Sequence, residues 1–117
     1  MPYDFNNQTP IYLQIIEEIT RKIIKGEYAL GEKIPSVREL AVQFEVNPNT
    51  IQKALYKLEE DKLIVTESTN GKFVTADSSV VNTVKEKTVN GLIDKFYDSM
   101  SAIGIDRYSA LKILNGR

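Results

Sequence analysis

The sequence predicts a mainly α-helical protein with one small β-hairpin, divided between residues 1–76 and a two-helix segment over residues 77–117. Three observations predict this arrangement. Two strong helix starts stand close together between residues 36 and 60, a hairpin signal follows at residues 70–71, and the segment after residue 77 repeats apolar side chains at helical spacing. A chain of 117 residues is long enough for one domain with an appendage.

The composition narrows the classes of function. An apolar fraction of 42% permits a hydrophobic core, whereas histidine and cysteine are both absent. Their absence excludes disulfides, thiolate chemistry, histidine-ligated metals and Ser-His-Asp triads. We therefore expect no enzymatic activity, no catalytic or metal-ligating residue and no cofactor. No apolar run reaches the ~18 residues of a membrane span and no leader opens the chain, so we expect a cytoplasmic protein without a membrane partner.

The N-terminal segment predicts an arm followed by a helix. Residues Met1–Thr9 are polar with two aromatic side chains, and we expect this arm to pack across a neighbour. Thr9 is predicted to cap the first helix, Pro10 to be its first residue and Gly26 to end it, with Gly31 as the turn point of the loop that follows. The apolar face, which we interpret as core, comprises Tyr12, Ile15, Ile16, Ile19, Ile23 and Ile24.

A second helix is predicted to begin at Ser36. The serine hydroxyl can accept a hydrogen bond from the Glu39 amide while the Glu39 carboxylate accepts one from the Ser36 amide, which is the reciprocal pattern of a capping box. Apolar side chains at helical spacing extend this helix to Phe44.

A third helix is predicted to begin only a few residues later. Asn47 is a favourable N-cap, and Pro48 suits the first helical position because its missing N–H has no partner there. One side of the helix is apolar, through Ile51, Ala54, Leu55 and Leu58. The other side carries the polar groups of Asn49, Gln52, Lys53, Tyr56 and Lys57. Two short helices joined by such a turn predict a helix-turn-helix, and the outward groups suit base edges and phosphates.

The residues after the third helix predict a β-hairpin. Short β-favouring runs over Leu63–Glu67 and Lys72–Thr75 flank an Asn-Gly dipeptide. A hairpin directly after a helix-turn-helix is a wing, so the fold class becomes a winged helix-turn-helix. We expect Phe73 and Val74 to pack in the core. Two interpretations stand for the tip: contact with a DNA backbone or minor groove, which we favour, and a hairpin that only completes the core. The tip residues are Thr69, Asn70, Gly71 and Lys72.

The last part of the chain predicts two helices that bind another copy. Asp77 or a neighbouring serine is expected to cap a helix that ends at Gly104. Asp106 is expected to begin a shorter helix that ends at Gly116. So few residues rarely form a stable domain alone, and the simplest partner for their apolar faces is a second copy. The alternative is that both helices fold back on the chain's own winged domain. The predicted dimer interface comprises Val81, Val84, Leu92, Phe96, Met100, Ile103, Tyr108 and Leu111.

The net charge does not by itself indicate a nucleic-acid-binding protein. Residues 1–76 carry nine basic against eleven acidic side chains, a net of −2, whereas residues 77–117 carry six against five, a net of +1. Binding of DNA therefore requires a local basic patch, with acids such as Glu17, Glu18, Glu59 and Glu60 held on other faces. The expected patch comprises Lys33, Arg38, Lys53, Lys57 and Lys72.

Residues 26–74 resemble the winged helix-turn-helix of GntR-type transcription regulators. The likeness rests on PSVRELA from Pro35, on VNPNTIQKAL from Val46 and on NGKFV from Asn70, and the short two-helix tail resembles the YtrA-like subgroup. This resemblance implies a homodimeric repressor that binds double-stranded DNA at an operator with two-fold symmetry, often in an operon encoding an ABC transporter. It does not identify the operator, the regulated genes or any small-molecule effector.

The family's DNA-binding positions can be matched to residues of this chain. Arg38 matches an arginine that reaches DNA, and Ser36 matches a serine that contacts phosphate. Asn49 matches the start of the recognition helix, and Gly71 matches the wing glycine that approaches the minor groove. Lys62 departs from the family pattern, in which glycine is common there, so the turn into the wing is the weakest part of the match. The predicted DNA-binding residues are Ser36, Arg38, Asn49, Thr50, Gln52, Lys53, Asn70, Gly71 and Lys72.

Two other functions fit parts of the sequence. A winged helix can bind another protein instead of DNA, which the acidic balance of residues 1–76 favours and the polar face of the third helix opposes. A small-molecule sensor needs a pocket, here between the C-terminal helices. We interpret the side chains that would line such a pocket as interface core instead; they are Phe96, Tyr97, Met100 and Tyr108.

Overall fold

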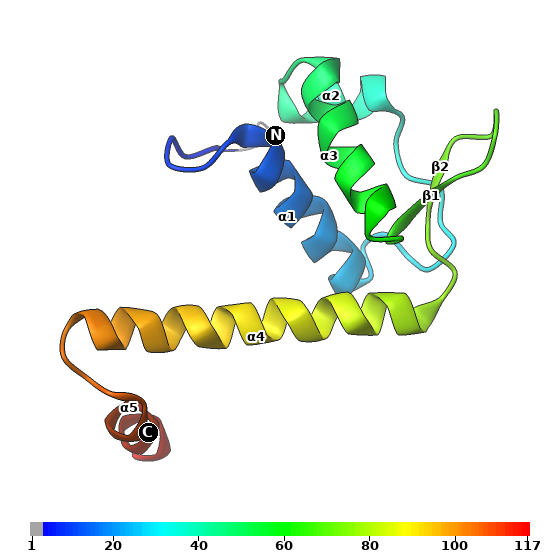
Figure 1. Ribbon diagram of the computed structural model, residues 1–117. Helices are drawn as coiled ribbons and strands as arrows, with labels where there is room; N and C mark the ends of the chain where they lie inside the picture. Colours follow the sequence, from blue (N-terminus) through cyan, green and yellow to red (C-terminus); the bar gives the residue numbers. More distant parts are fainter. Residues whose placement is uncertain (1–3) are drawn as a thin grey trace. The chain divides into compact units, whose positions relative to one another are not determined.

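The computed structural model describes residues 4–117 and confirms the predicted fold class, mainly helical with one two-stranded hairpin (Figure 1). Its elements are α1 (Ile11–Lys25), α2 (Val37–Phe44), α3 (Pro48–Glu60), β1 (Ile64–Thr66), β2 (Lys72–Val74), α4 (Ser78–Ala102) and α5 (Arg107–Asn115). The chain divides into two compact units, Met1–Asn82 and Thr83–Arg117, so the first turn of α4 belongs with the first unit. Within residues 4–117, no helix is both long and apolar enough to cross a membrane.

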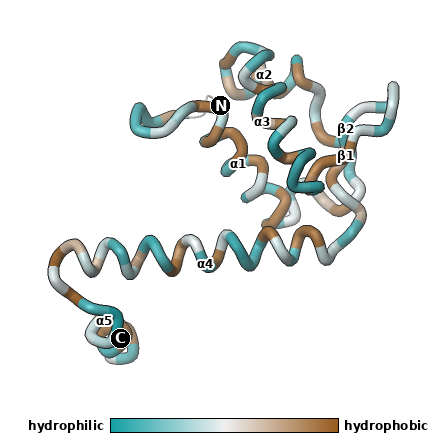
Figure 2. Tube along the Cα trace, viewed as in Figure 1, coloured by the Kyte–Doolittle hydropathy of each residue, from teal (hydrophilic) through white to brown (hydrophobic). Residues whose placement is uncertain are grey.

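The first unit has a core built from the apolar faces that the sequence predicted. Helix α3 contacts both α1 and α2, and hydrophobic stretches recur along these helices in Figure 2. Full burial of an aliphatic side chain stabilises a fold by ~1.5–3 kcal/mol, so this set fixes α3 firmly in place. The largest fully buried side chains are Ile15, Ile19, Leu40, Ile51, Leu55, Leu58, Leu63, Ile64 and Val74.

The start of α1 differs from the prediction. Pro10 has an extended ψ of 141° and occupies the N-cap position, and no side chain caps the helix, so Thr9 is not the cap and Pro10 is not the first helical residue. The buried side chain of Gln14 turns back to the preceding segment, where its Nε2 donates to the carbonyl oxygens of Thr9 at 2.8 Å and Asn6 at 3.0 Å. These bonds hold the chain extended as it enters the helix.

The arm packs on its own unit over the residues that the structure describes. The Phe5 ring stacks on the Phe44 ring of α2, with centroids 6.2 Å apart, and the Asn6 N–H donates to Gln14 Oε1 at 3.1 Å. These contacts lie within the arm's own unit, and packing of the arm across a neighbour stays a prediction. The part of that prediction that concerns residues 1–3 lies outside the described residues.

The hairpin forms where the sequence predicted it, but its turn lies elsewhere. Thr66 stands opposite Lys72 at the end of the ladder nearest the tip. The Asn70 N–H donates to the Glu67 carbonyl at 2.7 Å, so the chain reverses at residues 68–69 and not at the Asn-Gly dipeptide. Five residues separate the strands, too many for a two-residue turn. An Asn-Gly signal thus predicted the hairpin without fixing its register.

The loop before α2 covers the outer edge of β2. Lys33 forms an antiparallel bridge with Phe73, and the Val74 N–H donates to the Glu32 carbonyl at 2.8 Å. Pairing of this edge ties the wing to the segment that leads into α2. Val74 is buried as predicted, whereas Phe73 is half-buried.

The turn from α3 into β1 forms with a lysine where the family pattern has glycine. Lys62 adopts a left-handed φ of +64°, its N–H donates to the Glu59 carbonyl at 2.9 Å, and the Leu63 N–H donates to the Leu58 carbonyl at 3.0 Å. Lys62 therefore ends the helix in the left-handed conformation that glycine usually adopts at this position. The β-carbon of a non-glycine residue in this conformation lowers the stability of the fold by ~1–2 kcal/mol.

Two predicted carboxylate caps are confirmed in the C-terminal part of the chain. Asp77 Oδ1 accepts from the Ser79 N–H at 2.9 Å before α4, and Asp106 Oδ1 accepts from the Ser109 N–H at 2.8 Å before α5. The Ser79 hydroxyl also donates to Asp77 Oδ1 at 2.6 Å, and this bond is the main cause that holds the pKa of Asp77 below its ordinary value of 3.8, with the Ser79 N–H second. The Ser109 N–H is the main cause that lowers the pKa of Asp106 below the same value. Both helices therefore begin with an ionised carboxylate at neutral pH.

The second unit joins α5 to the last turns of α4. The Arg107 guanidinium lies 4.6 Å from the centroid of the Tyr97 ring and 3.7 Å from the Asp94 carboxylate. Ala110 is fully buried. These contacts fix the start of α5 after the chain has turned at Gly104, which has the left-handed φ of +84° that favours glycine.

Candidate nucleic-acid interface

The N-terminus of α2 presents Ser36 and Arg38. Ser36 Oγ accepts from the Glu39 N–H at 3.1 Å and Glu39 Oε1 accepts from the Ser36 N–H at 3.0 Å, which confirms the predicted capping box. Hydrogen bonding with Ser36 holds the pKa of the Glu39 carboxyl below its ordinary value. The bond from the Ser36 backbone N–H is the largest cause, and the Ser36 side chain is the second. Arg38 is exposed and makes no ion pair with residues 4–117. Its guanidinium can therefore donate two parallel hydrogen bonds to a guanine edge or a phosphate.

The first turns of α3 present amide groups. Asn47 Oδ1 accepts from the Asn49 N–H at 2.8 Å and caps the helix as predicted. The side chains of Asn49, Gln52 and Tyr56 are exposed, whereas Thr50 is half-buried. Within the part of the chain that the structure describes, the amide groups of Asn49 and Gln52 make no hydrogen bond, so both keep a donor and an acceptor for a base edge.

Lys53 extends from the same helix over an aromatic ring. Its ammonium lies 4.0 Å from the centroid of the Tyr12 ring on α1, close enough for a cation–π attraction. Lys53 is nevertheless exposed. The ring therefore restricts a long side chain that remains open to solvent on its other side.

The wing tip brings together two residues far apart in the sequence. Gly71 has a φ of +110°, and a β-carbon there would stand 2.9 Å from Lys33 Cε and 3.6 Å from Lys33 Nζ. The Lys33 side chain thus passes directly over the wing glycine, while Asn70 beside it is exposed. Sequence reasoning included Lys33 in the basic patch but not among the predicted contact residues, because no local pattern links Lys33 to the wing.

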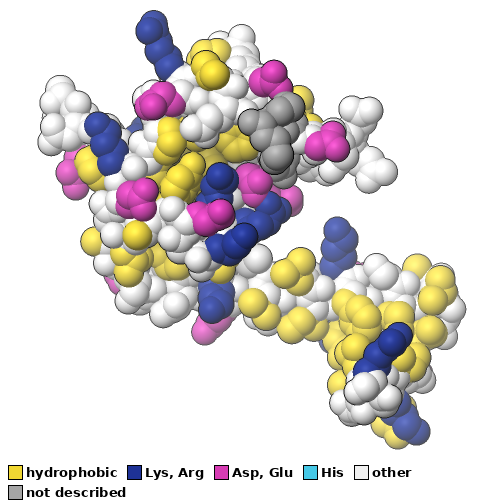
Figure 3. Space-filling view, turned by 180° about the vertical axis from the view of Figure 1, so that it is seen from behind, with side chains coloured by type: hydrophobic (Ala, Val, Ile, Leu, Met, Phe, Trp, Pro, Cys, Tyr) yellow, Lys and Arg dark blue, Asp and Glu magenta, His cyan; other side chains and the backbone are white. Residues whose placement is uncertain are grey.

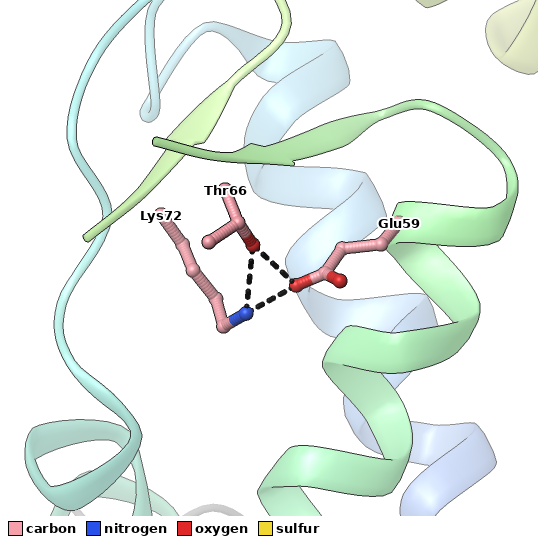
Figure 4. A network of polar contacts seen from close by, with 3 residues as sticks. All are labelled: Glu59, Thr66 and Lys72. Atoms are coloured by element: carbon pink, nitrogen blue, oxygen red, sulfur yellow. Dashed lines mark hydrogen bonds and ion pairs between the residues drawn. The ribbon is translucent and has the colours of Figure 1, made fainter. Parts of the chain in front are cut away.

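Lys72 points toward α3. Its ammonium forms an ion pair with Glu59 and donates to Thr66 Oγ1 at 2.9 Å, and the Thr66 hydroxyl donates to Glu59 Oε1 at 3.0 Å (Figure 4). The Lys72 and Glu59 side chains are each 28% exposed. Sequence reasoning missed Glu59 as the partner of Lys72, since the two lie on different elements.

The basic patch is smaller than the sequence suggested. Lys57 lies 3.8 Å from the Glu60 carboxylate and 3.7 Å from the Asp61 carboxylate, and Lys72 pairs with Glu59. The expectation that Glu59 and Glu60 lie away from the basic patch is therefore wrong, because the last turns of α3 bring these acids beside its lysines. Three patch residues have no carboxylate partner among residues 4–117: Lys33, Arg38 and Lys53.

A shallow hollow of about 450 Å³ lies beside β1 in the first unit. Glu59 and Asp77 contribute its carboxylates, but the first holds Lys72 and the second caps α4. This hollow is not the sensor pocket considered from the sequence, which concerned the C-terminal helices. There the rings of Phe96 and Tyr97 meet edge to face, with centroids 5.4 Å apart.

Several residues predicted for a dimer interface are apolar side chains that the Thr83–Arg117 unit does not bury by itself. Leu92 is 64% exposed, Ile103 72% and Tyr108 71%. Figure 3 shows hydrophobic side chains, in yellow, gathered over the C-terminal unit. Of the others, Phe96 and Leu111 are exposed and Val81, Val84 and Met100 are half-buried. No side chain of α4 is buried, and the structure describes that helix completely.

In comparisons with known proteins, a family model and a relative each match more than half of this chain. Residues 11–74 match the family described as bacterial regulatory proteins, gntR family. The HTH-type transcriptional repressor YtrA of Bacillus subtilis (strain 168) is 35% identical to this chain over an alignment of 100 residues, which covers 80% of this chain and 77% of that protein.

Solved structures also resemble this one. A GntR family transcriptional regulator from Listeria monocytogenes has a TM-score of 0.86 at 36% identity, over 97% of this chain and 99% of that chain. AraR(DBD) in complex with operator ORX1 has a TM-score of 0.58 at 32% identity, over 64% of this chain and 95% of that chain. This chain therefore belongs to the gntR family of bacterial regulatory proteins, as a transcriptional regulator whose first unit is a winged helix-turn-helix DNA-binding domain.

Proposed function

We propose that this regulator is a cytoplasmic homodimeric repressor that binds an operator with two-fold symmetry, in an operon such as one encoding an ABC transporter. The observation that carries the proposal is the exposure of large apolar side chains on α4 and α5, in a unit that buries only Ala110 within residues 83–117. The relative YtrA is a repressor, and AraR(DBD) forms a complex with an operator, which supports the same function here.

At each half-site the proposed reading element is α3. Its N-terminal turns enter the major groove, where Asn49 and Gln52 bind adenine edges and Lys53 reaches phosphate. Arg38 donates its paired hydrogen bonds to guanine or phosphate, and Ser36 binds a phosphate through its hydroxyl. The wing tip lies along the flank of the site. Two such domains bind half-sites one helical turn, about 34 Å, apart.

In this proposal the Thr83–Arg117 unit forms the dimer interface and so gives the protein its two-fold symmetry. The Thr83–Arg117 unit buries only Ala110 within residues 83–117, and so little buried surface does not keep two helices folded alone. Burial of Leu92, Phe96 and Ile103 against the same residues of a second copy would supply the missing core. The second domain then binds its half-site at a high effective concentration, which raises affinity for a full site.

Sedimentation equilibrium tests the dimer. Leu92→Asp places a charge in the apolar surface and is expected to give a monomer, while wild type sediments as a dimer. Asn90→Asp is the matched control, because helical spacing puts the same new charge on the other side of α4. A monomeric wild type, or a Leu92→Asp variant that dimerises like Asn90→Asp, would overturn the proposed interface.

Transcription in vitro from the promoter upstream of the gene tests repression. Wild type is expected to lower transcript yield, and Leu92→Asp to lower it far less because each half-site is then bound alone. A rise in transcript yield would identify an activator instead. No change in transcript yield, together with equal binding to all duplexes, would favour a winged helix that binds another protein.

A further inference from the structure

The wing needs external support to hold one orientation. Its ladder contains three residue pairs in a two-stranded sheet, and an isolated hairpin of this kind is only marginally stable in water. One support is the edge pairing between β2 and the Lys33 segment. That pairing leaves open how the tip end of the hairpin is held relative to α3.

The second support is the network of Glu59, Thr66 and Lys72. Glu59 lies in the last turn of α3, whereas Thr66 and Lys72 form the last residue pair of the ladder before the tip. The carboxylate of Glu59 accepts from both wing side chains, and the Lys72 ammonium also donates to Thr66 (Figure 4). Each side chain in the ion pair is roughly a quarter exposed, so solvent screens this pair less than a fully exposed one.

In the same network the Lys72 ammonium is already paired with a carboxylate. An ammonium held between a carboxylate and a hydroxyl must break those contacts before it can bind phosphate. Lys33 makes no ion pair within residues 4–117 and is exposed, and the nearby Glu39 carboxylate accepts a hydrogen bond from the Ser36 N–H. Its ammonium lies over the wing glycine Gly71. Lys72 on the wing is therefore paired, whereas Lys33, in the loop beside the wing, has no carboxylate partner within residues 4–117.

We propose that Glu59 and Lys72 are positioning residues that hold the wing against α3, and that Lys33 supplies the charge through which the wing binds phosphate. The proposal rests on the proposed DNA-binding function. In this arrangement the Glu59–Lys72 pair determines whether α3 and the wing reach the duplex together. Lys33 contributes affinity for any sequence, because a phosphate contact carries no sequence information.

The test is the salt dependence of DNA binding by the full-length protein. Fluorescence anisotropy gives the affinity for duplex DNA from upstream of the gene, and for a scrambled duplex, at several salt concentrations. Lys33→Gln is expected to weaken binding to both duplexes and to reduce the slope of log K against log salt by about 0.9, the value for one phosphate contact. Lys25→Gln, which removes an exposed cation at the end of α1, is the matched control with an unchanged slope.

The positioning pair has a different expected signature. Lys72→Gln is expected to weaken binding to the upstream duplex roughly fivefold and to leave the salt slope unchanged. Glu59→Gln releases the Lys72 ammonium, so it is expected to loosen the wing and to raise the salt slope by up to about 0.9. The exchanged pair Glu59→Lys with Lys72→Glu restores the ion pair and is expected to recover most of the affinity. A slope that falls by about 0.9 in Lys72→Gln, an exchanged pair that binds worse than either single variant, or an unchanged slope in Lys33→Gln would overturn the proposal.

Hydrogen exchange separates failure of this proposal from failure of the proposed function. Without DNA, Glu59→Gln is expected to speed exchange of the Glu67 amide, which closes the ladder on the Gly71 carbonyl at 2.9 Å, and to leave the amides of α2 unchanged. Unchanged exchange at Glu67 would overturn the positioning role even where DNA binding is normal. Wild type that binds both duplexes equally weakly would overturn sequence-specific recognition. The salt slope of Lys33→Gln still tests the phosphate contact in that case, and the exchange rate at Glu67 still tests the Glu59–Lys72 pair.

Discussion

The ammonium of Lys53 lies 4.0 Å from the centroid of the Tyr12 ring, so a residue of the first helix holds a cation of the recognition helix. The two elements also share the hydrophobic core through Ile19 and Ile51, both fully buried. Helix α1 thus supports α3 from within and at its surface. The contact gives α1 a role in the DNA-binding surface that its apolar face alone does not indicate.

A double-mutant cycle should detect this contact as a coupling energy. Tyr12→Leu and Lys53→Met each remove one partner, and their effects on the free energy of unfolding in urea are expected to be coupled by about 0.5–1 kcal/mol, the size of an exposed cation–π attraction. Tyr12→Phe keeps the ring and should retain the coupling. Strictly additive effects of Tyr12→Leu and Lys53→Met would show that the ring and the ammonium do not interact.

Arg38→Ala is expected to abolish operator binding with little change in the thermal midpoint. The guanidinium is exposed and has no carboxylate partner within residues 4–117, so its removal costs the fold little. A lost bidentate contact costs ~1–3 kcal/mol at each half-site. Anisotropy titration and thermal denaturation measure the two effects, with Arg21→Ala on α1 as the control. An Arg38→Ala variant that binds the operator normally would remove Arg38 from the interface.

Lys62→Gly should stabilise the protein. Lys62 has a φ of +64°, where a β-carbon is strained and glycine is not. The relief is partly offset by the greater freedom of glycine in the unfolded chain, which leaves an expected gain of about 0.5–1 kcal/mol. Urea unfolding measures the gain, and Lys62→Ala is the control that removes the charge but keeps the β-carbon. An equal gain from Lys62→Ala would assign the effect to charge.

Glu39→Gln should reduce the loss of folding stability as the pH falls from about 6 to about 3. The pKa of Glu39 is lowered from 4.5 by the hydrogen bonds from Ser36, so its ionised form stabilises the folded state above that pH. This contribution is lost as the pH falls through the lower folded value. Glutamine retains the capping-box geometry but does not titrate. Thermal midpoints between pH 6 and pH 3, taken as a series, test this expectation, and parallel curves for wild type and Glu39→Gln would contradict it.

Local sequence signals predicted the helix boundaries well. The caps at Ser36, Asn47 and Asp106 and the helix end at Gly26 depend on hydrogen bonds or φ values within a few residues, so the sequence carries them directly. Apolar periodicity predicted the core faces for the same reason. The mainly helical fold with a wing could therefore be predicted before any contact was seen.

Contacts between distant residues could not be predicted in this way. The pairing of Lys72 with Glu59 and the passage of Lys33 over Gly71 depend on how the wing lies against α3 and against the loop before α2. The side chain of Gln14 displaced a cap that local propensity assigned to Thr9. In each case tertiary geometry decided which polar groups meet, and charge counts along the chain gave a basic patch larger than the one that forms.

The most direct test of the central claim, that the winged domain reads a specific DNA sequence, is an anisotropy titration at about 0.15 M salt. The protein is titrated against duplex DNA from upstream of its own gene and against a scrambled duplex of the same composition. Specific recognition predicts that the upstream duplex binds ~10³-fold more tightly than the scramble. Equal and weak binding to both duplexes would contradict the claim.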